Sequence, residues 1–271
     1  MKINGIIDLT PTMVGAVPNG NLKNVIVDKG TSFPTGTSIP QAGQIFYYTG
    51  TSSASYPAPS LYAYDGSAWK QAGGPMLTAS IDYYIDPAGS DTTGDGSSGN
   101  PFKTVQHALD ITPKNLNTYD LTIWLNDGTY APFTAESFYG GYVTFYSSSD
   151  DPELVTITTG PNSVNVEHCS AFIYFYALSF QCITNGATGL ILTGSSAVYC
   201  FNCLFGDDGI ATGTYGVMNW LSILSMDDCF DIDANKVTTG IISYGNTQVR
   251  DVTNFGDTFA LPISSTVFIC L

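Results

Sequence analysis

The chain has 271 residues and a formal net charge of −15, from 23 acidic and 8 basic residues. It is 44% hydrophobic but only 11% charged, whereas about 25% of the residues of an ordinary globular protein are charged. The acidic balance makes nucleic acid and anionic membranes poor partners. The sequence shows neither the apolar core of a signal peptide nor a run of about 18 apolar residues. We therefore expect synthesis in a cytoplasm, without membrane insertion.

Residues 1–75 are predicted to form a small β module. The aromatic segments 41–48 and 61–70 predict strands joined by a loop, and Asp65-Gly66 supplies a hairpin turn before a last aromatic strand. Residues 1–40 are rich in Gly, Pro and Thr and are expected to be extended. Because a sheet of this size is barely stable alone, the module is expected to lean on a partner or another domain.

Residues 76–120 are predicted to supply a linker, a first strand at 83–86 and a capping helix. The helix is expected to start near Pro101 and to end at Pro113. Four apolar residues fall on one face of this helix at helical spacing: Phe102, Val105, Ala108 and Leu109. A short amphipathic helix of this kind would cover the otherwise exposed first coil of a solenoid.

Residues 121–271 contain an internal repeat of short apolar segments. Four segments begin at residues 172, 197, 223 and 247, and a second series begins at 164, 190, 216 and 241. A short, nearly constant period that includes no helix is typical of a parallel β-helix, in which each coil covers the apolar residues of the previous one. We therefore predict an all-β protein with a parallel β-helix over residues 121–271.

The cysteines are predicted to be reduced residues of the solenoid core. In the repeat, Leu178, Cys203, Cys229 and Thr253 share one column. Cys200 and Cys203 have CxxC spacing, but no second pair or histidine cluster accompanies them, so a zinc site is not expected. Small apolar thiols stacked from coil to coil fit this pattern better than disulfides do.

The stretch from Tyr83 to Ala108 contains Tyr-Tyr-Ile-Asp, Gly-Asp-Gly-Ser and Asn-Pro-Phe-Lys-Thr-Val-Gln-His-Ala, in that order. It resembles the opening of right-handed parallel β-helix proteins of the pectate-lyase-like class, above all those of bacteriophage tail spikes and fibres. Residues 121–130 resemble the first coil of this class, and residues 43–69 are similar to a short module of phage structural proteins. The fold class is therefore expected to be a right-handed parallel β-helix.

The resemblance implies a structural fibre or spike of a tailed phage. It would be a homotrimer assembled in the host cytoplasm and located on the virion, at the tail or, as a head fibre, on the capsid. Residues 1–75 would attach it to other virion proteins, and the β-helix would contact a polysaccharide or receptor of the host surface. The alternative on the same scaffold is a polysaccharide depolymerase, either a hydrolase or a lyase.

Enzymatic activity is not the preferred interpretation. Enzymes of the pectate-lyase-like class, as the resemblance implies, use a basic residue and Ca²⁺ held by carboxylates, yet Lys236 and Arg250 are the only basic residues after Leu121. A glycosidase needs two carboxyl groups facing each other. The candidates are Asp207, Asp208, Asp227 and Asp251. Asp227 and Asp251 share a column in the repeat, and turn formation in water is the other explanation for all four.

No cofactor or metal site is predicted. Residues 91–96 depart from the order of a calcium loop, so an Asx-rich turn is expected there, with Ca²⁺ as the alternative. His107 and His168 are interpreted as structural. Residues 172–176 place aromatic rings on both faces of one strand, and the outward rings are expected to pack against a neighbouring subunit or, alternatively, to stack on sugars.

Overall fold

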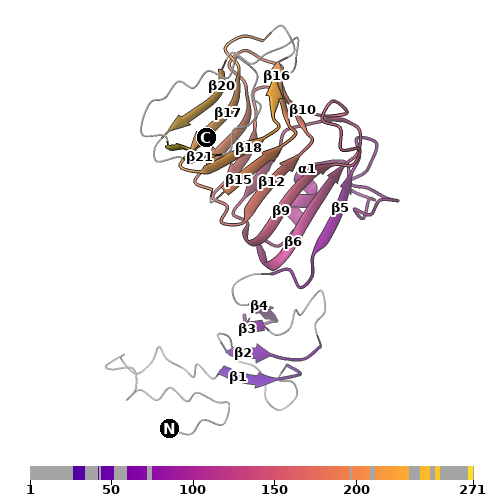
Figure 1. Ribbon diagram of the computed structural model, residues 1–271. Coiled ribbons are helices and arrows are strands. Elements are labelled where there is room, and N and C mark those ends of the chain that lie inside the picture. The colour runs from indigo at the N-terminus through magenta and orange to yellow at the C-terminus, as the bar shows by residue number, and fades with distance from the viewer. Residues whose placement is uncertain are drawn as a thin grey trace. The chain divides into compact units, whose positions relative to one another are not determined.

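The computed structural model describes residues 27–33, 42, 44–51, 60–71, 75–195, 197–207, 211–231, 239–244, 248–250 and 268–270. The chain divides into two compact units, Met1–Met76 and Leu77–Leu271. Figure 1 shows a small sheet in the first unit and a stack of long, parallel strands in the second. In the described part of the chain, no helix has the length and hydropathy that crossing a membrane requires.

The first unit contains a four-stranded sheet in the order β1-β2-β3-β4. Its strands are β1 (Val27–Gly30), β2 (Ile45–Tyr48), β3 (Ser60–Tyr64) and β4 (Trp69–Gln71). The predicted aromatic strands and the hairpin turn at Asp65 are present, and β1 adds a parallel partner to β2 from the segment that was expected to be extended. Phe46, Tyr62 and Trp69 are buried together and form the core of this sheet.

The second unit is a parallel β-helix made of three sheets. The long sheet consists of β5 (Ile81–Ile85), β6 (Asn115–Leu125), β9 (Tyr139–Ser147), β12 (Phe172–Tyr176), β15 (Ala197–Phe201), β18 (Ile223–Asp227), β21 (Gln248–Arg250) and β22 (Phe268–Cys270). The second sheet consists of β7 (Gly128–Tyr130), β10 (Val155–Thr159), β13 (Ser179–Cys182), β16 (Leu204–Asp207) and β19 (Phe230–Asp231). The third sheet consists of β8 (Thr134–Glu136), β11 (Val164–Glu167), β14 (Thr188–Thr193), β17 (Tyr215–Trp220) and β20 (Thr239–Tyr244).

The chain visits the long, second and third sheets in turn, so that neighbouring strands in a sheet come from successive coils. The predicted fold class, an all-β protein with a right-handed parallel β-helix, is confirmed. Ile173 pairs with Val198, and Val198 pairs with Leu224, at the spacing of the sequence repeat. Earlier coils depart from the repeat, since Leu121 pairs with Val143 after a shorter interval and Val143 pairs with Ile173 after a longer one.

The register differs by one residue from the predicted alignment at two points. Leu190 pairs with Val217 rather than Gly216, and Ile223 pairs with Gln248 rather than Thr247. A slip of one residue exchanges the inward and outward faces of a strand. Buried apolar residues therefore decide the register, and in the third sheet Val217 and Ile241 continue the inward column of Leu190.

The corners of the coils repeat a backbone conformation that is uncommon for side-chain-bearing residues. Two corner columns have positive φ: Ser137, His168, Gly194 and Leu221 in one, and Ala177, Asn202 and Asp228 in the other, with φ from 47° to 61°. In the first column, each backbone N–H donates to a carbonyl of the next coil, as His168 does to Thr193 at 2.8 Å. One left-handed residue turns the chain between sheets while the hydrogen bonding between coils continues.

The core fills the space between the three sheets. Phe145 stacks on Phe175 with ring centroids 5.0 Å apart, and Phe180 stacks on Phe205 at the same distance. Five cysteines are free and buried, as predicted: Cys169, Cys182, Cys200, Cys203 and Cys229. The registers on either side place Leu178, Cys203 and Cys229 in one column. Thr253, the last member of the predicted column, lies outside the described residues.

The predicted capping helix is present but shorter than expected. Helix α1 runs from Val105 to Ile111, and the Thr104 hydroxyl accepts a hydrogen bond from the backbone N–H of His107 at 3.2 Å. Val105, Ala108 and Leu109 are buried in the β-helix core. Phe102 is also buried, but it lies before the helix and forms a β-bridge with Ile85.

Candidate functional site

The outward face of the long sheet carries nine aromatic side chains in register, which we call the aromatic face: Tyr84, Trp124, Tyr142, Tyr146, Phe172, Tyr174, Tyr176, Tyr199 and Phe201. Side chains alternate between the two faces of a strand, so the inward neighbours of these rings fill the core. Parallel pairing then places the outward rings of successive coils directly over one another.

The longest aromatic column covers five coils. It runs from Tyr84 through Trp124, Tyr146 and Tyr176 to Phe201. Its ring centroids are 6.2, 5.0, 5.3 and 4.8 Å apart in this order. Because the rings rest on one another, the column presents ring edges and phenol hydroxyls to water, and little side-chain entropy remains to be lost on binding.

Two shorter columns lie beside it. Tyr174 stacks on Tyr199 at 4.8 Å, and Tyr142 stacks on Phe172 at 5.6 Å. Tyr142 is 44% exposed and Phe172 is 40% exposed. Burial raises the pKa of Tyr174, as it does for Tyr176 and Tyr146. These phenols therefore stay neutral and act as both hydrogen-bond donors and acceptors.

A polar pocket of about 400 Å³ lies beside the first three rings of the longest aromatic column, just beyond the ends of their strands. It is lined by Asp86, Asn126, Asp127, Ser148 and Ser149. Asp86, Asn126 and Ser148 each follow a column member, Tyr84, Trp124 and Tyr146, by two positions. The pocket therefore continues the outward face of the same three coils.

Asp86 is a fixed acceptor in this pocket. Its carboxylate accepts hydrogen bonds from the Asn126 side-chain amide at 2.9 Å and from the backbone N–H of Ala88 at 2.8 Å. These two hydrogen bonds lower the pKa of Asp86, so the group is ionised at neutral pH. The buried Tyr130 hydroxyl lies 2.6 Å from the Asn126 carbonyl oxygen and holds the adjacent backbone in place.

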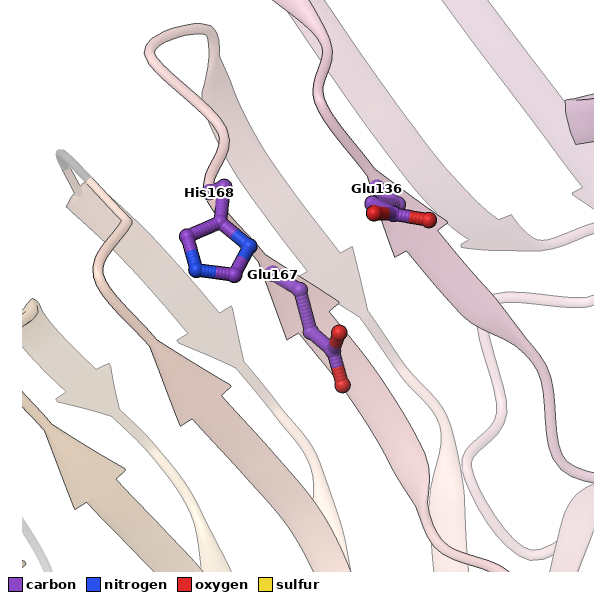
Figure 2. Close-up of side chains that lie close together, drawn as sticks. All are labelled: Glu136, Glu167 and His168. Carbon is purple, nitrogen blue, oxygen red and sulfur yellow. The ribbon is translucent and has the colours of Figure 1, made fainter.

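A second group of polar side chains lies on the third sheet. Glu136 and Glu167 end strands β8 and β11 and oppose each other in register, and His168 follows at the corner. Figure 2 shows Glu136 at the end of one strand and Glu167 and His168 at the end of its neighbour. One potential ligand atom from each residue lies within 4.8 Å of the other two. We call these three residues the Glu-Glu-His cluster.

The predicted acidic candidates are only partly described. Asp227 ends β18 and opposes Phe201, so it follows the last ring of the longest aromatic column. Asp207 ends β16 and opposes Cys182, but its side chain is outside the described residues, as are Asp208 and Asp251. The β18–β21 register is described as far as Ser225 opposite Arg250, and the predicted alignment of Asp227 with Asp251 lies outside the described residues.

The structure also describes the surroundings of the two histidines and of the turn that the sequence analysis considered. His107 packs edge-on against Phe102 at 4.8 Å, in agreement with a structural role. The predicted turn at residues 91–96 is present, and the Asp91 carboxylate accepts hydrogen bonds from the backbone of Lys103 and Thr104 and from the Thr104 hydroxyl. His168, interpreted from the sequence as structural, lies beside Glu136 and Glu167 in the Glu-Glu-His cluster.

Two solved structures resemble this chain at the level of the backbone. The pectin methylesterase from Aspergillus niger gives a TM-score of 0.37 at 15% identity, covering 72% of this chain and 66% of that protein. A rhamnogalacturonan lyase gives a TM-score of 0.26 at 16% identity, covering 62% of this chain and 67% of the lyase. A likeness of this size does not transfer an activity to this chain.

The sequence itself gives no such neighbour. No protein-family model matches the chain, and no curated protein matches it.

Proposed function

We propose that the β-helix binds a neutral polysaccharide along its aromatic face, with the polar pocket fixing one end of the ligand. The observation that carries this proposal is the five-coil column of rings, whose first three rings are flanked by a pocket containing Asp86 and Asn126. Sugars combine apolar C–H surfaces with many hydroxyl groups. Tyrosines with apolar bodies and neutral hydroxyl tips match both features, and a charged acceptor adds orientation.

The charge of the protein favours a neutral ligand over an acidic one. The net charge is −15, and the polar pocket contains two carboxylates, Asp86 and Asp127, without a lysine or arginine among its lining residues. A uronate or phosphate group entering this pocket would meet charge of its own sign. Hydroxyl groups, in contrast, can donate to the Asp86 carboxylate.

The biological setting that we propose is a structural fibre or spike of a tailed phage. Residues 1–75 would attach the chain to other virion proteins, and the aromatic face would contact glycans of the host surface. Support for this setting comes from the sequence resemblance and from the division of the chain into a small unit and a β-helix. In a homotrimer, the exposed rings of Tyr142 and Phe172 would be available for packing between subunits.

A direct test is binding of the full chain to a panel of neutral and uronate-containing polysaccharides, measured by calorimetry. We expect Tyr176→Ala to weaken binding of a neutral polysaccharide at least tenfold, and Asp86→Asn to weaken it by a similar factor. Tyr244→Ala is the control, because Tyr244 is an exposed tyrosine that lies on the third sheet, away from the aromatic face. Equal affinities for all these proteins would contradict the proposal.

Polysaccharide cleavage is the second candidate function, and the polar pocket is the observation that favours it. A glycosidase needs a pair of carboxyl groups, and Asp86 and Asp127 both line this pocket. The lowered pKa of Asp86 suits an acceptor better than a proton donor, which is why we prefer binding. New reducing ends during incubation with a bound polysaccharide, lost in Asp86→Asn or in Asp227→Asn with Asp251→Asn, would establish an enzyme instead.

A further inference from the structure

We propose that the Glu-Glu-His cluster is a binding site for a divalent transition-metal ion of the zinc type. Glu136, Glu167 and His168 each offer a ligand atom, and these three atoms lie within 4.8 Å of one another. The cluster belongs to the third sheet, whereas the aromatic face belongs to the long sheet. The proposal is therefore independent of glycan binding.

The composition of the chain makes this cluster unusual. The chain contains three glutamates, Glu136, Glu153 and Glu167, and two histidines. Two of the three glutamates and one of the two histidines come together at one corner, although a full coil of the β-helix separates Glu136 from Glu167 in the sequence. Surface acidity alone does not explain why an imidazole accompanies them.

The register forces the two carboxylates together. Glu167 opposes Glu136 directly in the parallel β8–β11 pair, and like charges in opposing positions destabilise a sheet. Lys114 and Glu136 attract each other electrostatically. The Lys114 ammonium, however, donates a hydrogen bond to the Leu109 carbonyl oxygen at 3.0 Å and lies 4.0 Å from the centre of the Phe138 ring. A bound cation would offset the repulsion between the glutamates.

The corner conformation brings the imidazole to the same side as the carboxylates. In a regular strand, His168 would point inward after the outward Glu167. The φ of His168 is 53°, which interrupts this alternation. His168 is therefore exposed, and the next residue, Cys169, is the one buried in the core. The backbone N–H of His168 donates to the Thr193 carbonyl oxygen at 2.8 Å, and the backbone carbonyl oxygen of Glu167 accepts from the backbone N–H of Ser137 at 3.0 Å. Hydrogen bonds to both neighbouring coils thus hold the cluster backbone.

The donor set selects the class of metal. One imidazole nitrogen with two carboxylates suits Zn²⁺ and related first-row ions, whereas Ca²⁺ and Mg²⁺ prefer oxygen donors alone. Three protein ligands leave coordination positions for water or a ligand oxygen.

The test uses untagged, EDTA-treated full-length protein and titrates it with ZnCl₂ by calorimetry. We expect one Zn²⁺ per chain, with at least tenfold weaker binding in Glu136→Gln, Glu167→Gln and His168→Ala. The matched controls are Glu153→Gln and His107→Gln, the remaining glutamate and histidine of the chain, which should bind Zn²⁺ as the parent does. No Zn²⁺ binding, or binding unaffected in the cluster variants, would overturn the proposal, as would equal affinity for Ca²⁺.

The melting temperature, measured with and without Zn²⁺, is a second test, and its expected result cannot arise from a variant that merely fails to fold. Without metal, Glu167→Gln should melt at a higher temperature than the parent, because it removes the like-charge pair. With Zn²⁺ present, the parent should gain stability and the variant should gain much less. If Glu167→Gln melts lower than the parent without metal, or if Zn²⁺ raises both melting temperatures equally, the site is not as we describe it.

Discussion

At the scale of one residue, Cys203 shows that the core of the β-helix accommodates only uncharged side chains. Its thiol is fully buried, and the sulfur lies 3.3 Å from the Phe201 carbonyl oxygen and 3.5 Å from that of Phe175. Burial raises the pKa of this thiol well above its ordinary value, so it remains neutral. Leu178 and Cys229 occupy the same column on the adjacent coils.

We therefore predict that Cys203→Asp destabilises the protein by about 4 kcal/mol or more, because it buries a carboxylate without a partner. Asn202→Gly is the control. Asn202 is the exposed neighbour of Cys203 at a left-handed corner, where glycine is tolerated, so its effect should stay within about 0.5 kcal/mol. Urea unfolding followed by circular dichroism measures both, and equal midpoints would show that the core register is wrong.

Asp91 links the Gly-rich loop to the start of the capping helix. Burial raises the pKa of Asp91, but hydrogen bonds from the Thr104 hydroxyl and from the Thr104 and Lys103 backbones outweigh burial and lower it. A carboxyl group with a lowered folded-state pKa contributes stability above its ordinary pKa of 3.8, and this contribution is lost as the pH falls through the lowered value.

Asp91→Asn should therefore reduce the free energy of unfolding at pH 7 by about 1–2 kcal/mol, the loss expected for hydrogen bonds to a charged acceptor. The difference between parent and variant should shrink as the pH falls from 3.8, where Asp91 of the unfolded chain takes up its proton, through the lowered pKa of Asp91 in the folded chain. Urea titrations at pH 7 and at several more acidic pH values provide the comparison. A difference that stays constant across this range would contradict the role of the ionised carboxylate.

At the scale of the element, the corner columns decide how each strand ends. Leu221 has a φ of 61° and is 63% exposed, so its side chain adds strain at the corner without contributing to the core. Gly194 occupies the same corner on the preceding coil with a φ of 57°. The position thus accepts glycine in this fold.

Leu221→Gly is expected to stabilise the β-helix by about 0.5–1 kcal/mol, because relief of left-handed strain exceeds the greater flexibility of glycine in the unfolded chain. Leu221→Ala is the control, since it removes the same exposed side chain but keeps the Cβ that causes the strain. The midpoints of urea unfolding should rank glycine above both leucine and alanine. The reverse order would mean that the corner carries no strain.

The elements also show which features could be read from the sequence. Inward apolar residues recur at a nearly constant interval in the later coils, so the β-helix and the Leu178–Cys203–Cys229 column were predictable. The earlier coils vary, and the chain between Tyr84 and its partner Trp124 is lengthened by α1. Irregular connections of this kind hid the extension of the aromatic face to the earlier coils and the pairing of Glu136 with Glu167, because no constant period brings these residues together.

At the scale of the whole molecule, we predict that the first compact unit attaches the chain to the virion and that the second, the β-helix, folds without it. We predict that a chain beginning at Met76 keeps its β-rich circular dichroism spectrum and a cooperative unfolding transition, since the β-helix has its own continuous core. We also expect this truncated chain to be missing from virions assembled in its presence, whereas the full chain is incorporated. Incorporation of the truncated chain would place the attachment function elsewhere.

The subunit number gives a further check on the fibre proposal. A homotrimer should have three times the chain mass of 28.8 kDa by light scattering coupled to size exclusion. If the aromatic face contributes to contact between subunits, Tyr142→Ser together with Phe172→Ser should lower the measured mass. A parent that runs as a monomer would remove the trimer from the proposal and leave glycan binding in place.

The aromatic column offers a ring on each of five successive coils and so defines no single starting position for a bound chain. Its five coils repeat at about 4.8 Å, so the rings extend over roughly 19 Å. A flexible glycan lying along this axis can shift by one coil and meet another aromatic ring, so several alignments contribute to binding at once. Affinity should consequently climb with oligosaccharide length and level off once the chain outgrows the column, while the polar pocket at the sheet edge favours one end of the ligand.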